Sequence, residues 1–280
     1  MRYVFFGSPR FATIVLTQLM DAGFMPTALV CNPDRPAGRK QIITPPSTKE
    51  LVVRRMQTAP VIQPEKMTND FANDVRVLNP DLFIVAAYAH IIPSAVLDIP
   101  RLGTLGVHPS LLPAYRGASP IQSAILDGAT TSGTSIYLMD AKMDHGLIVA
   151  QQSLLMTPDE TYESLETKLA SLSGGVLVRA LPDFIAGKIN PAPQDEMRAT
   201  YTKKFETQDG FIDGQDLAKA ETGDLATATL VYRKIRALNP EPGCWTIKNN
   251  KRIKLLEATM KNGVFKLVTI QEEGGRPKPA

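Results

Sequence analysis

The sequence has little cysteine: Cys31 and Cys244 are its only two, and neither has a second thiol or a histidine at metal-ligand spacing. A disulfide framework and a cysteine-based zinc site are therefore excluded, and we expect a reducing compartment and a reaction without metal. No apolar run approaches the roughly 18 residues that a membrane helix needs. The opening MRYVFFG is typical of a strand and not of a basic leader. We therefore expect a cytoplasmic protein with no membrane association.

Two common catalytic motifs are also missing. The segment FGSPRF, after the expected first strand, has one glycine where a dinucleotide fingerprint needs three. A nucleotide cofactor is therefore not indicated, and a tight turn explains Gly7. Ser110 lies in VHPSLLP and not in a G-x-S-x-G elbow, so a nucleophilic serine is not indicated either. The length of 280 residues, of which 44% are hydrophobic, permits one large and one small domain.

Segments of strand length and helix length alternate through the first 185 residues. Apolar runs bounded by turn residues favour buried strands, and apolar residues at helical spacing favour amphipathic helices. The predicted strands are 1–6, 27–32, 60–63, 81–88, 104–107 and 134–139, and the predicted helices are 11–21, a segment from about 49, 69–78 and 159–185. Residues 33–47 are expected to form a long loop. The alternation predicts an α/β fold with a mainly parallel sheet covered by helices on both faces.

The C-terminal third has a different pattern. Residues 188–207 are polar, contain two prolines and show no sustained apolar period, which is typical of a linker. A helix at about 226–238 is followed by strand-length runs at 245–248, 252–259 and 264–270, with NN and NG turn signals between them. The tail 272–280 is expected to be disordered. We therefore expect a first domain over 1–187, a linker over 188–207 and a small β-rich domain over 208–280.

The stretch from Gly103 to Gly146 carries the most chemical information. His108 follows an apolar strand, and Pro109 and Pro113 delimit a turn that a central strand would not continue through. Asp144 follows the end of the strand at 134–139. Open α/β sheets place their sites at strand ends, an imidazole titrates near neutrality, and a carboxylate can hold its tautomer and favour its charged form. His108 and Asp144 are therefore the predicted catalytic residues.

The segment HPSLLPAYRGASPIQ, followed later by MDHG, resembles the folate-dependent formyltransferases, and among them the methionyl-tRNA formyltransferases. FFGSPRFA, NPDRPAGRKQIITPPSTKE, LFIVAAYAHIIPSAVL and YRKIRALNPEPGCWT resemble further segments of the same enzymes in the same order. The resemblance covers most of the chain. It implies a Rossmann-like catalytic domain, which is the formyltransferase fold, followed by a small OB-like barrel, a fold that often binds nucleic acid.

The activity that this resemblance implies is transfer of a formyl group from the cosubstrate 10-formyltetrahydrofolate to the α-amine of methionyl initiator tRNA. An amine that attacks the formyl carbon needs a donor near the developing oxyanion and a group that handles the amine proton. The resemblance assigns these tasks to His108 and Asp144. It implies that the SLLP turn forms part of the folate wall, through Ser110, Leu111, Leu112 and Pro113. The acting form is expected to be a monomer.

Two basic groups are candidates for contacts with the tRNA. The resemblance implies that the loop with Arg35, Arg39 and Lys40 enters the acceptor region, and a loop of this length is usually functional. In the second domain the candidates are Arg233, Lys234 and Arg236, followed by Lys248, Lys251, Arg252 and Lys254 around Trp245. Clustered cations can follow a phosphate backbone. A solvated basic surface is the alternative for both groups.

Other polar residues of the site region have simpler explanations. His145, beside Asp144, is expected at the rim of the site, and Asp140 is expected as a loop or capping carboxylate. His90 is assigned either to packing or to the folate side of the site. Trp245 is expected in the core of the small domain.

One position departs from the family pattern. Two residues before the histidine the family normally has an asparagine whose carboxamide helps catalysis, and here that residue is Gly106. A bound water, Gln122 or the charged His108 could substitute for the carboxamide. Restoring asparagine should preserve or raise the rate if the pocket has not repacked, whereas a loss of folding would indicate a need for glycine. Gly106 therefore leaves a non-catalytic RNA-binding relative open as an alternative. A nucleotide-sugar N-formyltransferase also stays open, because such enzymes resemble the HPSLLP and MDHG core equally well.

Overall fold

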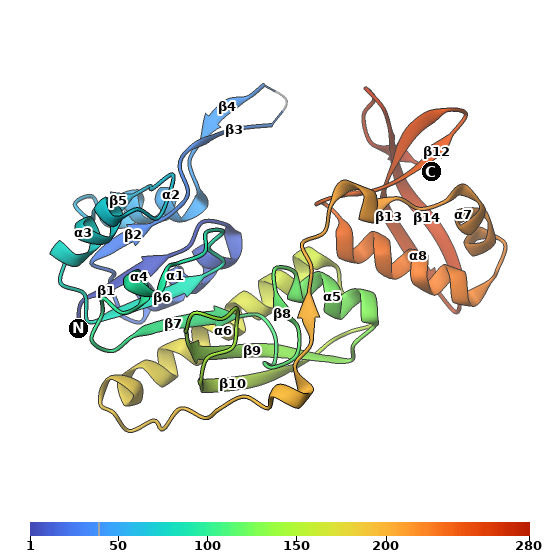
Figure 1. Ribbon diagram of the computed structural model, residues 1–280. Coiled ribbons are helices and arrows are strands. Elements are labelled where there is room, and N and C mark those ends of the chain that lie inside the picture. Colours follow the sequence, from blue (N-terminus) through green and yellow to red (C-terminus); the bar gives the residue numbers. More distant parts are fainter. Residues whose placement is uncertain (39) are drawn as a thin grey trace. The chain divides into compact units, whose positions relative to one another are not determined.

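The computed structural model describes residues 1–38 and 40–280, and its contacts divide the chain into two compact units (Figure 1). Unit 1 consists of residues 1–116, 133–154 and 166–200, and unit 2 consists of residues 117–132, 155–165 and 201–280. Unit 2 is thus assembled from three separate stretches of sequence. The expected domain boundaries at 187 and 208 stay a prediction.

Unit 1 is built on a seven-stranded sheet with the order β10-β9-β7-β6-β1-β2-β5. Its strands are β1 (Tyr3–Phe6), β2 (Ala28–Val30), β5 (Val61–Ile62), β6 (Leu82–Ala86), β7 (Thr104–His108), β9 (Thr131–Leu138) and β10 (Ile148–Leu155). The four pairings that join β7, β6, β1, β2 and β5 are parallel, and β7 pairs with β9 antiparallel. The prediction of a mainly parallel α/β sheet is therefore confirmed.

Helices cover this sheet because its central strands are buried along their whole length. The helices are α1 (Arg10–Asp21), α2 (Ser47–Arg55), α3 (Asn69–Val77), α4 (Ser94–Leu97) and α6 (Tyr162–Ile185). Thr68 caps α3 by accepting a hydrogen bond from Phe71 N at 3.3 Å. On one face, α3 and α4 contribute Phe71 and Val96 to a core cluster with Phe6 and Phe83 of the sheet. A strand buried on both faces lacks polar alternation, and the sequence shows this property.

The expected loop at 33–47 contains a hairpin. Its strands are β3 (Arg35–Ala37) and β4 (Ile42–Thr44), which pair antiparallel from Arg35↔Thr44 to Ala37↔Ile42. Both strands are exposed throughout, so no alternation between apolar and polar residues marked them in the sequence. Arg39 lies outside the described residues.

Unit 2 contains the predicted antiparallel β structure. The order of its sheet is β12-β13-β14-β15, formed by β12 (Cys244–Lys248), β13 (Lys251–Lys261), β14 (Val264–Glu272) and β15 (Lys278–Pro279). The expected disordered tail is wrong, because β15 pairs with β14 through Thr269↔Pro279 and Ile270↔Lys278. The backbone of a proline-containing tail can add to a sheet edge without an apolar signal in its sequence.

Helices pack against this sheet. They are α7 (Gly214–Glu221) and α8 (Leu225–Leu238), while α5 (Pro120–Asp127) packs against α8. Asp224 caps α8 by accepting a hydrogen bond from Thr227 N at 2.8 Å. The expected linker includes short elements: the 3-10 helices η1 (Glu196–Arg198) and η2 (Thr207–Gly210), and β11 (Tyr201–Thr202), while β8 is Arg116–Gly117.

Trp245 is partly exposed and packs on Phe211 with ring centroids 4.7 Å apart.

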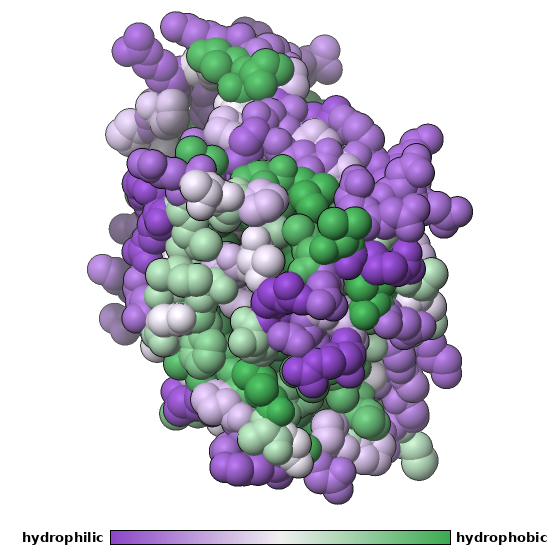
Figure 2. Space-filling model, turned by 90° about the vertical axis from the view of Figure 1, so that its left-hand side faces the viewer, coloured by the Kyte–Doolittle hydropathy of each residue, from purple (hydrophilic) through white to green (hydrophobic). Residues whose placement is uncertain are grey.

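The surface mixes apolar and polar side chains. Figure 2 shows hydrophobic patches surrounded by hydrophilic residues on the face that it presents. Exposed large hydrophobic residues of unit 1 include Ile42 and Ile43 of the hairpin, each 61% exposed. Among residues 1–38 and 40–280, none of the helices has the length and apolarity required to cross a bilayer.

Candidate active site

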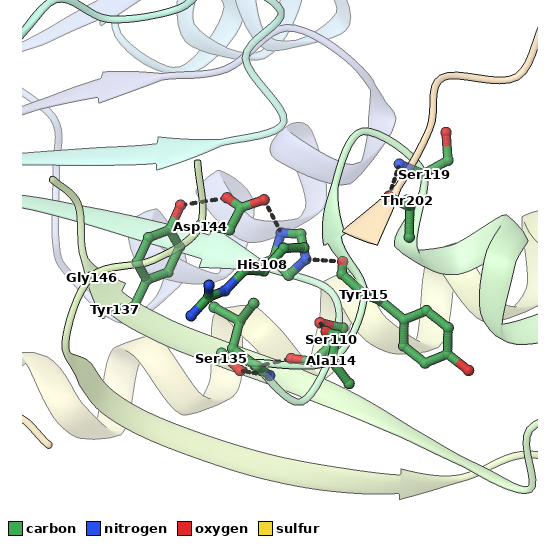
Figure 3. A network of polar contacts seen from close by, with 12 residues as sticks. His108, Ser110, Ala114, Tyr115, Ser119, Ser135, Tyr137, Asp144, Gly146 and Thr202 are labelled. Atoms are coloured by element: carbon green, nitrogen blue, oxygen red, sulfur yellow. Dashed lines mark hydrogen bonds and ion pairs between the residues drawn. The ribbon is translucent and has the colours of Figure 1, made fainter. Parts of the chain in front are cut away.

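His108 ends β7 and lies almost fully inside unit 1, with 6% of the residue exposed. Its Nε2 donates to the carbonyl of Tyr115 at 2.9 Å, and its Nδ1 lies 3.7 Å from Asp144 Oδ2 (Figure 3). A carbonyl oxygen can only accept, so this contact assigns a proton to Nε2. The second distance is longer than a hydrogen bond but close enough for charges to interact. The structure therefore brings the two predicted catalytic residues together.

Asp144 reaches His108 by a different route from the one that the sequence suggested. Because β9 runs antiparallel to β7, Leu138 at its end pairs with Leu105, while Ser135 pairs with His108. The end of β9 and the end of β7 therefore lie at opposite edges of the sheet. The loop after β9 brings Asp144 to His108 and Tyr137, and Asp144 adopts φ +51° within it. Aspartate tolerates this left-handed conformation better than most residues do.

Tyr137 of β9 is a third member of this site. Its hydroxyl donates to Asp144 Oδ1 at 2.7 Å, so the two oxygens of the carboxylate face different partners (Figure 3). Burial raises the pKa of the Tyr137 phenol well above its ordinary value, and the neighbouring charge of Asp144 raises it further. The phenol therefore keeps its proton at neutral pH and acts as a donor.

Gly106 lies directly opposite Tyr137 in the pairing of β7 with β9. A Cβ added at Gly106 would lie 2.4 Å from Tyr137 Cε1, 2.5 Å from Cζ and 2.9 Å from the hydroxyl oxygen. The backbone of Gly106 does not have a positive φ, so side-chain packing and not backbone conformation requires glycine here. The site has therefore repacked around this glycine.

The SLLP turn is held from inside the protein. Ser110 is 1% exposed and its hydroxyl donates to Ala114 O at 2.6 Å, while Leu112 is 4% exposed. Ser135 accepts from Leu112 N at 3.0 Å and donates to Ser110 O at 2.7 Å. Leu111 and Pro113 are partly exposed. Contact of these four residues with folate stays a prediction. The buried Ser110 and Leu112 shape the turn, whereas Leu111 and Pro113 are accessible to a ligand.

A buried arginine supports the loop that carries Asp144. Arg116 has no exposed surface, and its guanidinium donates to Gln194 Oε1 at 2.7 Å and to Glu196 Oε1 at 2.6 Å. Gln194 in turn donates to the carbonyls of Asp144 at 2.9 Å and Gly146 at 2.8 Å. The segment after α6 thus fixes the backbone on both sides of residue 145. Buried polar groups require such partners.

His145 and Asp140 pair with each other at the rim, as expected for surface polar groups. Asp140 Oδ2 lies 2.6 Å from His145 Nδ1, and Glu196 Oε1 lies 3.6 Å from its Nε2. The side chain of Asp140 is 42% exposed and that of His145 is 31% exposed. His90 packs beside Tyr88, with ring centroids 5.4 Å apart.

The pair of Glu196 with Arg116 predicts a pH-dependent part of the stability. Hydrogen bonds from Arg116 hold the pKa of Glu196 below its ordinary value of 4.5, so its stabilising effect is present above that value and is lost as pH falls through the folded-state pKa. We expect Glu196→Gln to lower the urea midpoint at neutral pH and this difference from wild type to vanish as the pH falls below the folded-state pKa of Glu196. Exposed Glu50→Gln is the control. A difference that persists unchanged in acid would contradict the assignment.

The candidate tRNA residues of the hairpin are exposed. Arg35 has a side chain that is 63% exposed and forms an ion pair with Glu65, and Lys40 is exposed in the turn. Arg39 cannot be placed, because it falls outside the described residues. An exposed ion pair stabilises little, so Arg35 can exchange Glu65 for a phosphate at low cost.

The basic residues of α8 have partners inside unit 2. Arg233 donates to Asp127 O at 3.2 Å, Lys234 donates to Phe211 O at 2.6 Å, and Arg236 donates to Glu160 O. Arg236 also stacks on Tyr232, 4.4 Å from the ring centroid, and burial lowers its pKa. A role of this trio in binding tRNA stays a prediction, and it would have to compete with these contacts.

A second basic group in unit 2 is more accessible. Lys248, Lys251 and Lys254 are exposed, and the Arg252 guanidinium lies 4.2 Å from the centroid of the Trp245 ring. Among the described residues, His, Cys, Asp and Glu nowhere form a group of three that could hold a metal ion.

Sequence reasoning found His108 and Asp144 but missed the residues that orient them. Tyr137 looked like one apolar residue of a strand, and Gln194 and Glu196 lay in the segment assigned to a linker. Arg116 belongs to the HPSLLPAYRGASPIQ motif, but nothing in the motif indicates its structural role. One signal that could have found Tyr137 is its pairing with Gly106, a bulky residue opposite a glycine. This pairing can be recognised only when the register of β7 against β9 is known.

Comparison with protein families matches residues 1–181 to formyl transferase and residues 225–277 to the formyl transferase C-terminal domain. The methionyl-tRNA formyltransferase of Chloroflexus aurantiacus (strain ATCC 29366 / DSM 635 / J-10-fl) is 38% identical over 261 residues, which cover 93% of this chain and 80% of that protein. The one from Listeria monocytogenes serovar 1/2a is 35% identical over 277 residues, which cover 99% of this chain and 82% of that protein.

Solved structures show the same fold. The methionyl-tRNA formyltransferase from Clostridium thermocellum matches with a TM-score of 0.61 and 17% identity over 97% of this chain and 98% of that one. The N-formyltransferase from Helicobacter canadensis, solved with folinic acid and dTDP-3-aminofucose, matches with a TM-score of 0.66 and 16% identity over 93% of this chain and 88% of that one. Taken with the family match and the curated relatives, this chain belongs to the formyl transferase family, in the branch whose curated members are named methionyl-tRNA formyltransferases.

Proposed function

We propose that this protein transfers the formyl group of 10-formyltetrahydrofolate to the α-amine of methionyl initiator tRNA. The observation that carries the proposal is the His108–Asp144 pair, which lies at the positions where the family motif implies it and in a nearly closed environment. Curated relatives at 35–38% identity over more than nine tenths of the chain support this acceptor. We further propose a monomeric cytoplasmic enzyme.

The folate donor supplies an activated formyl carbon. Attack by the amine forms the new C–N bond, and a negative charge develops on the formyl oxygen. The amine then loses a proton, and the bond between the formyl carbon and the folate nitrogen breaks as that nitrogen takes up a proton. His108 is the group that can carry a proton between these nitrogens, because a neutral imidazole is both acceptor and donor. Asp144 faces its Nδ1 and stabilises positive charge there.

The folate donor would lie against the accessible part of the SLLP turn. Leu111 and Pro113 are partly exposed, while internal hydrogen bonds of Ser110 and Ser135 keep the turn rigid. Such a combination of apolar side chains and a fixed backbone suits a flat aromatic ligand. The direct test is formylation of methionyl initiator tRNA by the purified protein with 10-formyltetrahydrofolate.

The same assay separates the alternatives. A nucleotide-sugar amine offered in place of the tRNA tests the sugar alternative, because the solved sugar N-formyltransferases share only the fold at this level of identity. Formylation of the sugar and not of the tRNA would overturn the proposal. Binding of tRNA without any formyl transfer would favour the non-catalytic alternative.

The hairpin predicts a salt-sensitive contact with the acceptor. If Arg35, Arg39 and Lys40 neutralise phosphates, tRNA binding releases counterions and weakens steeply as salt is added. We expect replacement of all three by alanine to reduce the slope of log Kd against log salt by about two to three units and to raise KM for the tRNA. The measurement is tRNA binding at several salt concentrations.

Lys188→Ala is the matched control, because Lys188 is also an exposed cation of unit 1, with a side chain 71% exposed. The control should keep the wild-type slope, and the triple variant should keep the wild-type affinity for the folate donor. Equal slopes in the triple variant and the wild type would show that the hairpin cations are only a solvated surface.

A further inference from the structure

The pairing of Tyr137 with Gly106 is the feature of the site that the proposed reaction leaves unexplained. Tyr137 is 3% exposed, and its ring occupies the space in which a side chain at residue 106 would begin. Its hydroxyl oxygen is 2.9 Å from the position of that absent Cβ. A polar group is therefore present beside residue 106, but it comes from β9 and not from β7.

The hydroxyl is directed at one oxygen of Asp144. The bond to Oδ1 is 2.7 Å long, while Oδ2 faces His108 Nδ1 at 3.7 Å. His108 itself is too far away to hold the carboxylate by a hydrogen bond. The phenol, which its buried position keeps protonated, is a donor placed to orient this side chain toward the imidazole.

The backbone of Asp144 is held separately. Gln194 donates to the carbonyls of Asp144 and Gly146, so the loop has an anchor that does not depend on Tyr137. Removal of the phenol hydroxyl should therefore remove this hydrogen bond from the carboxylate while the loop stays in place. This separation makes the contribution of the hydroxyl measurable by itself.

We propose that Tyr137 is a positioning residue that holds the Asp144 carboxylate toward His108, and that Gly106 is required because the Tyr137 ring occupies its side-chain space. The proposal rests on the proposed function for its kinetic consequences only. In this chain, Tyr137 of the neighbouring strand provides a polar group beside residue 106. The family resemblance implies a carboxamide at this place.

The test is Tyr137→Phe, which removes one oxygen and keeps the ring over Gly106. We expect kcat for formyl transfer to fall about tenfold or more, with KM for both substrates within about twofold. Tyr3→Phe is the matched control, because Tyr3 is also a buried strand tyrosine of unit 1 and donates one hydrogen bond, to Phe24 O at 2.8 Å. The control should keep its kcat. Equal kcat values in the two variants would overturn the proposal.

A double-mutant cycle separates positioning from a general loss of structure. A residue that acts through Asp144 has nothing to act on once the carboxylate is removed, so Tyr137→Phe should lower kcat no further in an Asp144→Ala background. The same loss in both backgrounds would overturn the proposal. Single-turnover rates give the four values.

A spectroscopic measurement makes the outcome independent of the reaction. If wild-type protein does not formylate methionyl tRNA, the proposed function fails, yet the positioning of Asp144 can still be read from the imidazole nitrogen-15 shifts of His108. These shifts should change in Tyr137→Phe and stay at their wild-type values in Tyr3→Phe. Unchanged His108 shifts in Tyr137→Phe would overturn the inference whatever the activity.

Discussion

Replacement of His108 by alanine, or of Asp144 by asparagine, is expected to lower the rate of formyl transfer by at least about a hundredfold. The ring of His108 faces Asp144, and the carboxylate is the group that stabilises positive charge at Nδ1. Both residues act at the reacting centre, so tRNA affinity and the thermal midpoint should change little. The measurement is the single-turnover rate with saturating folate donor.

Asp140→Asn is the control for the charge change, since Asp140 lies in the same loop but pairs with His145. Its rate is expected to stay within about threefold of wild type. Unchanged turnover in His108→Ala would remove His108 from the mechanism. A collapse of the thermal midpoint in either site variant would mean that the rate reports folding and not chemistry.

Replacement of Gly106 by asparagine is expected to destabilise the protein by about 1–3 kcal/mol or more, as overpacking of a closed core does. The new Cβ would lie 2.4 Å from the Tyr137 ring, and Tyr137 is buried opposite Gly106 in the pairing of β7 with β9. Displacement of the ring would also break the hydrogen bond from the Tyr137 hydroxyl to Asp144. Activity should therefore fall, although the substitution introduces the residue that the family normally has here.

The rescue experiment is the double variant Gly106→Asn with Tyr137→Ala, which removes the ring that the asparagine meets. We expect it to recover much of the stability lost by Gly106→Asn, whereas Tyr137→Ala alone should be destabilising because it leaves a cavity. Urea unfolding of the four proteins gives the coupling. Additive effects would mean that the two residues do not compete for space.

Local features were predictable from the sequence because they depend on neighbours along the chain. Buried strands such as Tyr3–Phe6 and Leu82–Ala86 are continuous apolar runs, and α8 begins with a capping aspartate. The prolines around SLLP predicted a turn after His108. These signals, together with the order of the family segments, determined the fold class and the predicted catalytic pair.

The relations between distant segments were decided only by the tertiary structure. The direction of β9 is set by its pairing with β7 and not by its composition, so the sequence suggested that Asp144 and His108 lay at the same sheet edge. The tail strand Lys278–Pro279 exists only because β14 offers it an edge.

The partners of the catalytic pair belong to the same class. Arg116 is buried because Gln194 and Glu196 satisfy its guanidinium from a segment that looked like a linker. The role of Gly106 depends on Tyr137, which lies 31 positions away in the chain and opposite it in the sheet. A sequence records which residues are present, but the space that each one occupies is determined by what packs across from it.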